Sequence, residues 1–379
     1  MKLNKVYAVN FRNYSSYTLD IKAMINVFYG RNAQGKTNLL EAIFYSAFGL
    51  SHRTSKEEEL MKIASNEMAV GVEYSNFTGN HNIKIKKYQL SNSTKKEILL
   101  DGVKVKPKEH YGNLNVVMFS PEDLQLVKGE PALRRRYFDM QISQTDPVYY
   151  DLLVQYNRVL QQRNQLLKDI RESKAVPGML EVWNDRFAEL AFRITEKRIA
   201  ALQKLKLISE KIYSSITSNE EILTIKYEQK ANNKTLLYPE KAEECSREFY
   251  LKGLKEREQL DIYRGNTGIG PHRDDIAILI NGISMKAFGS QGQQRSGALA
   301  LKLSQIEYIF QEIGEYPLLL LDDVMSELDN NRRSQLLLFI DGKVQTFITV
   351  NDKELIPDLP LNAYFKISEG NIFEEKNDQ

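Results

Sequence analysis

The sequence predicts an α/β protein with mixed sheets, interrupted by a largely α-helical inserted domain. Short strand-like runs occupy both ends of the chain, a glycine-bounded loop joins an early strand to a helix, and the middle carries long helical periodicities. Alternating strands and helices favour an α/β sheet, whereas sustained 3.6-residue periodicity favours packed helices. We therefore expect residues 1–120 and 262–379 to form one discontinuous domain and residues 121–261 to form a helical arm.

The N-terminal segment has the order strand, loop, helix. Val6–Val9 and Ile25–Tyr29 are apolar runs of strand length. The apolar residues that follow recur at three- and four-residue steps, which predicts a helix; they are Leu39, Leu40, Ile43, Phe44, Ala47 and Phe48.

The stretch from Met68 to Val105 predicts an antiparallel sheet. Ile83 and Ile85 alternate with lysines, and Asp101-Gly102 separates two short runs. An Asp-Gly pair favours a tight hairpin because both turn residues must reach positive φ.

The middle of the chain predicts two long helices, Pro147–Arg171 and Met179–Ile216, with Pro177-Gly178 between them. Arg198 interrupts the apolar stripe of the second helix. Coiled coils usually sustain about three or four unbroken heptads, so a helical hairpin that packs on itself is preferred and a coiled coil is the alternative.

After residue 262 the chain returns to alternating elements. We expect strands at Asp275–Ile280, Pro317–Leu321, Val344–Val350 and Ala363–Ile367, and helices at Gln291–Ile313 and Arg332–Ile340.

The composition limits the possible function classes. The chain has 52 Lys and Arg against 50 Asp and Glu, a formal net charge of +2, which argues against a constitutive polyanion binder. Cys245 is the only cysteine, which excludes an internal disulfide and a four-cysteine zinc site. Because neither a signal peptide nor a membrane-spanning run is evident, we expect a cytoplasmic protein.

The glycine-bounded loop fits the pattern G-x-x-x-x-G-K-[ST], which binds phosphates through backbone N–H groups and a helix N-terminus. In this pattern Lys36 reaches the β- and γ-phosphates of a nucleotide and the Thr37 hydroxyl binds Mg²⁺. The matching residues are Gly30, Arg31, Asn32, Ala33, Gln34, Gly35, Lys36 and Thr37.

Two further segments carry polar groups. Asp322 and Asp323 follow the apolar run Pro317–Leu321, so their carboxylates are expected at the carboxyl end of a strand, where open α/β sheets bind ligands. Asp322 would bind Mg²⁺ and Asp323 would face the γ-phosphate. A second phosphate-compatible helix start, with two glycines nearby, consists of Ser290, Gln291, Gly292, Gln293, Gln294 and Arg295.

Together these segments resemble the ABC-type ATPase heads of the SMC and RecF group. The phosphate loop, the acidic strand, the SQGQQR segment in the position of the ABC signature, and Ser326-Glu327-Leu328-Asp329 in the position of the D-loop carry the resemblance. Further matching segments run along the whole chain: Asn10–Tyr14, Gly35–Ile43, Phe119–Leu124, Arg134–Asp139 and Gly270–Asp275.

The resemblance implies an ATP-dependent homodimer in which Ser290–Gln294 of one subunit closes over the γ-phosphate that Lys36 of the other holds. It also implies that Asp322 is the metal carboxylate and that Asp323 stands where a catalytic glutamate is usual. Aspartate is one methylene shorter, so we expect slow hydrolysis. Ser326 and Asp329 would lie at the dimer seam.

The sequence departs from the wider ABC pattern at two other places. Glu122, within Ser120-Pro121-Glu122, stands near the position of the usual Q-loop glutamine, and Asn351 stands at the position of the switch histidine. The four histidines have no metal-ligand spacing. Of these, His272, beside Arg273, is the strongest candidate for a role beyond structure.

Nucleic-acid binding is only weakly indicated by the residues themselves, because a basic face matters more than a total charge. The candidate basic patches are Lys84, Lys86 and Lys87; Lys104, Lys106 and Lys108; and Arg134, Arg135 and Arg136.

The resemblance implies a weak, DNA-stimulated ATPase that acts as a switch in recombinational repair and replication restart. Its dimer would clamp duplex DNA near single/double-strand junctions, help RecO- and RecR-type mediators to load recombinase, and release DNA on hydrolysis. Two alternatives are the ATPase subunit of a membrane transporter and a phosphotransferase that uses the phosphate loop alone. The helical insertion and the SQGQQR segment argue against them.

Overall fold

The computed structural model describes residues 1–90, 93–217, 220–231, 234–238, 245–356 and 362–375. The chain divides into two compact units, described separately below: unit 1 comprises Met1–Asp123 and Ile309–Gln379, and unit 2 comprises Leu124–Tyr308. Among the described residues, no helix combines the length and the apolar character needed to cross a membrane.

The described part of unit 1 contains two six-stranded sheets. The first is antiparallel, with the order β2-β1-β4-β5-β6-β7. Its strands are β1 (Lys2–Phe11), β2 (Tyr14–Asp20), β4 (Glu67–Asn76), β5 (Gly79–Leu90), β6 (Ser93–Leu100) and β7 (Val103–Val105). The antiparallel sheet expected between Met68 and Val105 is present, and β1 and β2 extend it.

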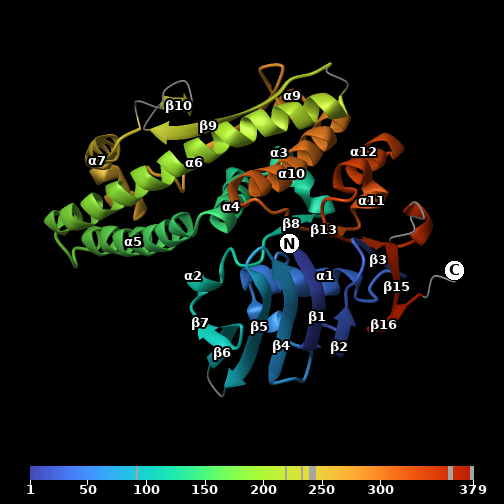
Figure 1. Ribbon diagram of the computed structural model, residues 1–379. Helices are drawn as coiled ribbons and strands as arrows, with labels where there is room; N and C mark the ends of the chain where they lie inside the picture. Colours follow the sequence, from blue (N-terminus) through green and yellow to red (C-terminus); the bar gives the residue numbers. More distant parts are fainter. Residues whose placement is uncertain (91–92, 218–219, 232–233, 239–244, 357–361, 376–379) are drawn as a thin grey trace. The chain divides into compact units, whose positions relative to one another are not determined.

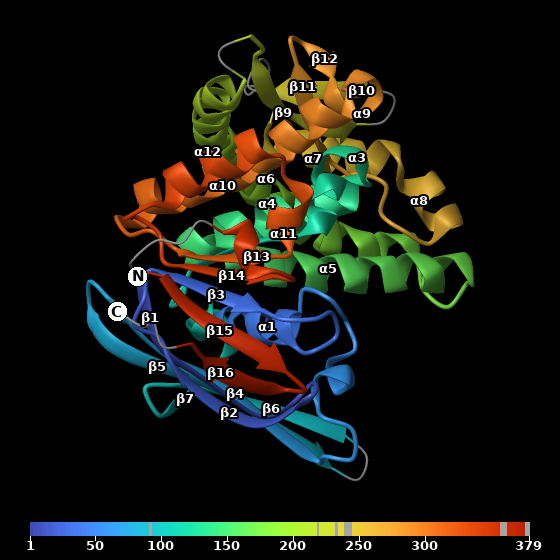
Figure 2. The same cartoon turned by 90° about the vertical axis from the view of Figure 1, so that its right-hand side faces the viewer.

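The second sheet is mixed, with the order β16-β15-β3-β14-β13-β8, in which β16 alone runs antiparallel to its neighbour. Its strands are β3 (Ile25–Tyr29), β8 (Val116–Phe119), β13 (Leu318–Asp322), β14 (Thr346–Val350), β15 (Asn362–Ser368) and β16 (Asn371–Glu374). The strands β8, β13 and β14 are buried throughout, as expected for parallel strands covered on both faces. Figure 2 shows β3, β15 and β16 as one layer.

The helices of unit 1 connect and cover these sheets. Helix α1 follows β3 directly, and eleven of its 13 residues are buried, including Leu39, Leu40 and Ile43. In Figure 1 it lies over the antiparallel sheet. The helices and 3-10 turns are α1 (Lys36–Phe48), η1 (Glu57–Leu60), α2 (Pro107–His110), α11 (Val324–Glu327), α12 (Asn330–Ile340) and η5 (Lys353–Leu355); η2 (Pro121–Leu124) leads out of the unit.

Unit 2 is built around a helical hairpin. Helices α5 and α6 pack along one another, and Leu167 and Leu180 belong to their shared apolar cluster. The hairpin preferred from the sequence is therefore confirmed. The helical elements are α3 (Gln125–Lys128), α4 (Pro131–Thr145), α5 (Pro147–Arg171), η3 (Pro177–Met179), α6 (Leu180–Ile216), α7 (Arg247–Glu256), α8 (Glu258–Arg264), α9 (Met285–Phe288) and α10 (Gln291–Ile313), which continues into unit 1.

Arg198, which interrupts the apolar stripe of α6, is 4% exposed. It forms a bidentate pair with Asp139, at 2.9 Å for each bond, and donates to the Pro271 carbonyl at 2.7 Å. A buried charge needs such complete pairing. The apparent break in the stripe is therefore an internal ion pair.

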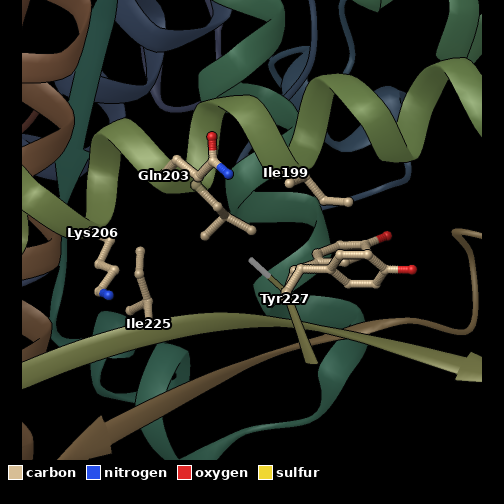
Figure 3. Close-up of a pocket in the computed structure, with 7 residues that line it drawn as sticks. Ile199, Gln203, Lys206, Ile225 and Tyr227 are labelled. Carbon is tan, nitrogen blue, oxygen red and sulfur yellow. The ribbon is translucent and has the colours of Figure 1, made fainter. Parts of the chain in front are cut away.

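A four-stranded sheet with the order β10-β9-β11-β12 completes the described part of unit 2. Its strands are β9 (Leu223–Ala231), β10 (Lys234–Tyr238), β11 (Asp275–Ile280) and β12 (Ile283–Ser284). We did not expect β9 and β10 from the sequence. Figure 3 shows β9 facing α6 across a pocket of about 10 Å³, with Tyr227 opposite Ile199 and Ile225 near Lys206. That volume is about enough for one water molecule, so this pocket is a packing gap.

The chain returns to unit 1 at Ile309, whereas the sequence predicted that it would return at residue 262. Strand β11 pairs with β9 along its whole length, and Arg134 forms a bidentate pair with Asp275 at 2.8 Å for each bond. These contacts place residues 262–308 in unit 2, because a strand belongs to the sheet that satisfies its backbone groups.

Candidate functional site

The phosphate loop joins β3 to α1 in a conformation that requires glycine at both ends. Gly30 has φ 150° and Gly35 has φ 115°, a region that L-residues rarely adopt. A Cβ on Gly30 would lie 2.4 Å from the Ile367 carbonyl oxygen, and one on Gly35 would lie 2.7 Å from Asn13 Nδ2. The two glycines therefore allow neighbouring segments to approach the loop closely.

The N-terminus of α1 has no side-chain cap, since its N-cap residue is Gly35. The first N–H groups of an α-helix lack partners inside the helix and carry the positive end of the helix dipole. An uncapped start at the end of a glycine loop is therefore suited to a phosphate group. The side chains of Arg31, Asn32 and Ala33 are exposed, so these residues offer mainly their backbone.

Two terminal segments brace the loop around Gln34. Asn13 Nδ2 donates to the Gln34 carbonyl at 3.2 Å, and the Tyr14 hydroxyl donates to the Gly35 carbonyl at 3.0 Å. From the other end of the chain, the Glu369 N–H donates to Gln34 Oε1 at 2.6 Å. The sequence identified the loop but not these supports, although Asn13 and Tyr14 lie in one of the matching segments.

Lys36 is 7% exposed, and three oxygens orient its ammonium group. It donates to the carbonyls of Gly30 at 2.6 Å and Arg31 at 2.9 Å, and to Asn351 Oδ1 at 3.0 Å. The position at which a switch histidine was expected therefore lies against the loop lysine, and Asn351 supplies the contact there.

Asp322 lies at the end of β13, beside Thr37 and Thr349. The hydroxyls of both threonines donate to Asp322 Oδ1, at 2.9 Å from Thr37 and 2.8 Å from Thr349. Burial raises the pKa of Asp322, and these two hydrogen bonds oppose the rise. Burial also lowers the pKa of Lys36, against the attraction of Asp323 and Asp322.

The donor set of Thr37 and Asp322 fits Mg²⁺. Both offer hard oxygen atoms, which hydrogen-bond at 2.9 Å and are therefore close enough to share one ion. Mg²⁺ usually takes one or two protein ligands and completes its shell with water and phosphate. Thr349 was not expected from the sequence; its signal was only that it lies near the carboxyl end of β14, the strand next to the acidic one.

Asp323 has a left-handed backbone, with φ 53°, which is uncommon for a residue other than glycine. Its N–H donates to the Thr349 hydroxyl at 3.0 Å, and its carboxylate accepts from the Ser326 hydroxyl at 3.2 Å. Such unusual conformations concentrate at functional sites. Asp329 caps α12 by accepting from the Arg332 N–H at 2.9 Å.

The signature-like segment forms the capped start of α10 in unit 2. Ser290 N donates to Gln293 Oε1 at 2.7 Å, and Gln293 N donates to Ser290 Oγ at 3.2 Å, which is a capping box. Gln293 Nε2 also donates to Glu221 at 2.6 Å, and Gln294 Nε2 donates to the Met285 carbonyl at 3.2 Å. Ser290 and Gln291 are exposed, while Gly292 is partly exposed.

The structure corrects two of the basic patches named from the sequence. Arg134 is 5% exposed and its guanidinium is paired with Asp275, so it stabilises the fold of unit 2. Lys87 is 2% exposed and lies 3.6 Å from Glu57. Neither side chain is placed to contact a ligand at the surface, and the reason is the same: alternate positions of a helix or strand point inward.

Two other positions named from the sequence have clear surroundings. Glu122 is exposed in the turn η2 that follows β8. His272 is partly buried between the Tyr156 hydroxyl, 2.6 Å from Nδ1, and the Thr267 carbonyl, 3.0 Å from Nε2. Burial and the neighbouring Arg273, Arg135 and Arg198 lower the pKa of His272 to about 4, although the Thr267 hydrogen bond opposes this, so it is neutral at pH 7.

Comparison with known proteins decides the family. Residues 2–369 match the family model described as RecF/RecN/SMC N terminal domain. The proteins named DNA replication and repair protein RecF from Acetivibrio thermocellus and Lactococcus lactis subsp. cremoris are 42% and 41% identical, over 98% and 99% of this chain and 100% of each relative.

The chain belongs to the RecF family. A solved structure described as the recombination mediator protein RecF-ATP in the RecFOR pathway is 38% identical, with a TM-score of 0.89 over 99% of this chain and 98% of that one. An Smc head bound to a domain of ScpA has a TM-score of 0.57 at 14% identity, with 100% and 98% of the two chains covered, and so shares the fold. The expected fold class, an ABC-type ATPase head with mixed sheets and a helical insertion, is thus confirmed. With RecF membership, the transporter and phosphotransferase alternatives lose their support.

Proposed function

We propose that the chain is an ATP-dependent switch that binds DNA in recombinational repair and replication restart. The observation that carries the proposal is the convergence of Lys36, Thr37, Asp322 and Asn351 at the carboxyl edge of the mixed sheet. An uncapped helix start, an oriented lysine and a pair of oxygen ligands are the parts that a nucleoside triphosphate with Mg²⁺ requires. The RecF-ATP structure gives ATP as the nucleotide in a relative.

The residues of the loop would bind and orient the triphosphate. The backbone N–H groups around Gly35 hold phosphate oxygens, and the Lys36 ammonium group moves from neutral carbonyls to the β- and γ-phosphates. Thr37 and Asp322 hold Mg²⁺, which neutralises phosphate charge when bound. Asp323 orients the attacking water. Because its carboxylate is one methylene shorter than that of glutamate and already accepts from Ser326, hydrolysis is slow.

The signature-like segment would act in a second copy of the chain. Ser290–Gln294 of one copy contact the γ-phosphate held by Lys36 of the other, so two ATP molecules hold two copies together, with Ser326 and Asp329 near the seam. What supports this step is that unit 2 carries a second helix start of phosphate-binding type, which a single nucleotide bound by unit 1 does not need.

The dimer would bind duplex DNA, with preference for single/double-strand junctions, and would help RecO- and RecR-type mediators to load recombinase. The names of the relatives support the repair role, and the RecFOR pathway named for a solved relative supports the choice of mediators. The chain would be a weak ATPase that DNA stimulates, and hydrolysis of the bound ATP would release the DNA.

The test is DNA binding measured by fluorescence anisotropy with ATP and Mg²⁺, with ADP, and without nucleotide. Of the three states, we expect tight binding only with ATP and Mg²⁺. In that state a duplex with a single-stranded tail should bind more tightly than a blunt duplex. Equal binding in all three nucleotide states would show that the chain is not an ATP-dependent switch.

A further inference from the structure

Unit 2 contains a groove of about 890 Å³ whose lining includes five cationic side chains. The groove lies among the start of α4, the end of β9, α8 and the segment that follows α8. We call it the arginine groove, and its charged residues are Arg135, Lys230, Arg257, Arg264 and Arg273. Glu130 is the one carboxylate among the described residues that line it.

Two of these cations are held by hydrogen bonds to neutral oxygens, which leave their positive charge in place. Arg135 Nη1 donates to the Asp274 carbonyl at 2.6 Å. Arg273 Nε donates to the Thr267 carbonyl at 3.2 Å, and Nη2 donates to the same carbonyl at 3.1 Å. Such bonds fix the direction of a guanidinium group and leave its other N–H groups for a ligand.

Arg257 is the exception, because it lies 3.6 Å from the buried carboxylate of Asp261. Asp261 also pairs with Arg163 at 3.3 Å, so one carboxylate faces two guanidinium groups. In the described part of the chain, no ion pair involves Arg135, Lys230, Arg264 or Arg273. The groove thus carries an excess of positive charge.

The positive charges of the groove are partly buried and lie near other positive groups, which is unfavourable. A bound anion would offset this cost. Burial, and next the charge of Arg198, lower the pKa of Arg135, although the carboxylates of Asp275, Asp274 and Asp139 oppose this. The 15-residue helix α4 begins at the groove with Pro131 and Ala132 and has no side-chain cap, so its positive dipole end adds to the field. A phosphate group placed here would meet several guanidinium donors in forked geometry.

Several lysines on the antiparallel sheet of unit 1 are different. Lys5 pairs with Glu73 at 3.2 Å, and both Lys95 and Lys104 pair with Glu97, at 3.2 and 2.9 Å. Exposed pairs of this kind reduce the local excess of charge. The arginine groove is therefore a better anion receptor than these paired lysines.

We propose that the arginine groove binds the phosphate backbone of DNA. This inference rests on the DNA-binding function proposed above and assigns it a site. Among the described residues, the lining has no Phe, Tyr or Trp on which a base could stack, and the ring nitrogens of His272 are already bonded. The groove therefore fits a backbone contact without sequence preference. Five cations along a groove suit several successive phosphates better than one free nucleotide.

The test uses the variant Lys230→Glu/Arg264→Glu in the full chain. Both side chains are exposed and neither makes a side-chain hydrogen bond within the described residues, so the change spares the fold. Binding of fluorescein-labelled duplex is measured by anisotropy with ATP and Mg²⁺ over a salt series. We expect affinity to fall about tenfold or more and the log–log salt slope to fall by about two.

The matched control is Lys95→Glu/Lys104→Glu on the sheet of unit 1, which carries the same change of charge and should leave the slope nearly unchanged. Dimerisation with ATP, measured by light scattering, should be unaltered in both variants. An unchanged affinity and slope in the groove variant would overturn the proposal. The proposal would also be overturned if the groove variant bound duplex normally but no longer bound poly-glutamate, since the ligand would then be an acidic protein segment. If the unmodified chain binds no DNA in any nucleotide state, the failure lies with the proposed function itself.

Discussion

The starts of α1 and α10 are chemically similar but differently prepared. Both follow a glycine-containing loop and both are expected at a phosphate. At α1 the N-cap is Gly35, and no side chain accepts from the first turn. At α10, Ser290 and Gln293 already satisfy one another's backbone N–H groups.

This difference suits the start of α1 to be the nucleotide receptor and the start of α10 to be a contact surface for a nucleotide bound elsewhere. The donors at α1 have no internal substitute, so a phosphate there satisfies groups that otherwise depend on solvent. At α10 the Ser290 oxygen accepts from the helix while its O–H remains available as a donor. The first site can therefore bind nucleotide within one chain, whereas the second is suited to add a few contacts to a phosphate that another copy has already bound.

The largest expected effect is at the receptor. Lys36→Ala removes a buried cation that would form charge-assisted bonds to the phosphates, each worth about 1.5–3 kcal/mol. We expect the affinity for a fluorescent ATP analogue with Mg²⁺ to fall about a hundredfold in a titration. The exposed Lys22→Ala serves as control and should bind as the unmodified chain does. Equal affinities for the two variants would mean that α1 is not the nucleotide site.

The next effect is at the contact surface. Ser290→Arg places a long side chain where the phosphate of a second copy would approach, so ATP-dependent dimerisation should weaken about tenfold or more, as measured by light scattering. ATP binding by the monomer should be unchanged, because the proposed nucleotide site lies in unit 1. Ser290→Ala removes only the hydroxyl and should weaken the dimer about fivefold, the cost of one hydrogen bond. Normal dimerisation of the Arg variant would rule out the two-copy arrangement.

A smaller effect is expected for the chemistry at the receptor. Asp323→Glu restores the length of the usual glutamate, and we expect ATP turnover to rise about threefold in a phosphate-release assay under saturating DNA. The left-handed backbone of Asp323 limits the gain, since aspartate tolerates this conformation better than glutamate. Asp323→Asn, which keeps the shape and removes the charge, should abolish turnover and leave ATP binding intact. Full turnover in the Asn variant would place the water-orienting group elsewhere.

The smallest effect concerns stability. Gln293→Ala removes half of the capping box at α10, and the free energy of unfolding should fall by about 0.5–1 kcal/mol in urea titrations. The exposed Gln291→Ala should change it by much less. Equal losses in the two variants would indicate that the capping box contributes nothing to unit 2.

Local patterns in the sequence were sufficient for the parts of the site that lie on one element. The loop from Gly30 to Thr37, the carboxylates after β13 and the start of α10 each depend on neighbouring residues and on strand or helix periodicity, and each lies on its expected element. The composite site between two copies is not tested by one chain and stays a proposal.

Contacts between distant segments could not be predicted in the same way. Thr349 reaches the site because β14 lies between β3 and β13, an order that no local pattern specifies. Asn351, just after the same strand, was expected there only through the resemblance, at the position of the switch histidine. The strand β9 was missed because its alternation of Ile225 and Tyr227 with polar residues stands in a helix-rich region, and β10 was missed because it is short and shows no such alternation. Arg134 looked like a surface cation because its partner, Asp275, lies 141 positions away.

The phosphate loop is held from both ends of the chain. Asn13 and Tyr14 bond to it from the N-terminal segment, whereas Glu369 bonds to Gln34 and the Ile367 carbonyl packs against Gly30 from the C-terminal segment. A chain that is still being synthesised lacks the second support until residues 367–369 have left the ribosome. The shape of the loop would therefore be completed only after these residues are made, so that shorter nascent chains would not compete for nucleotide.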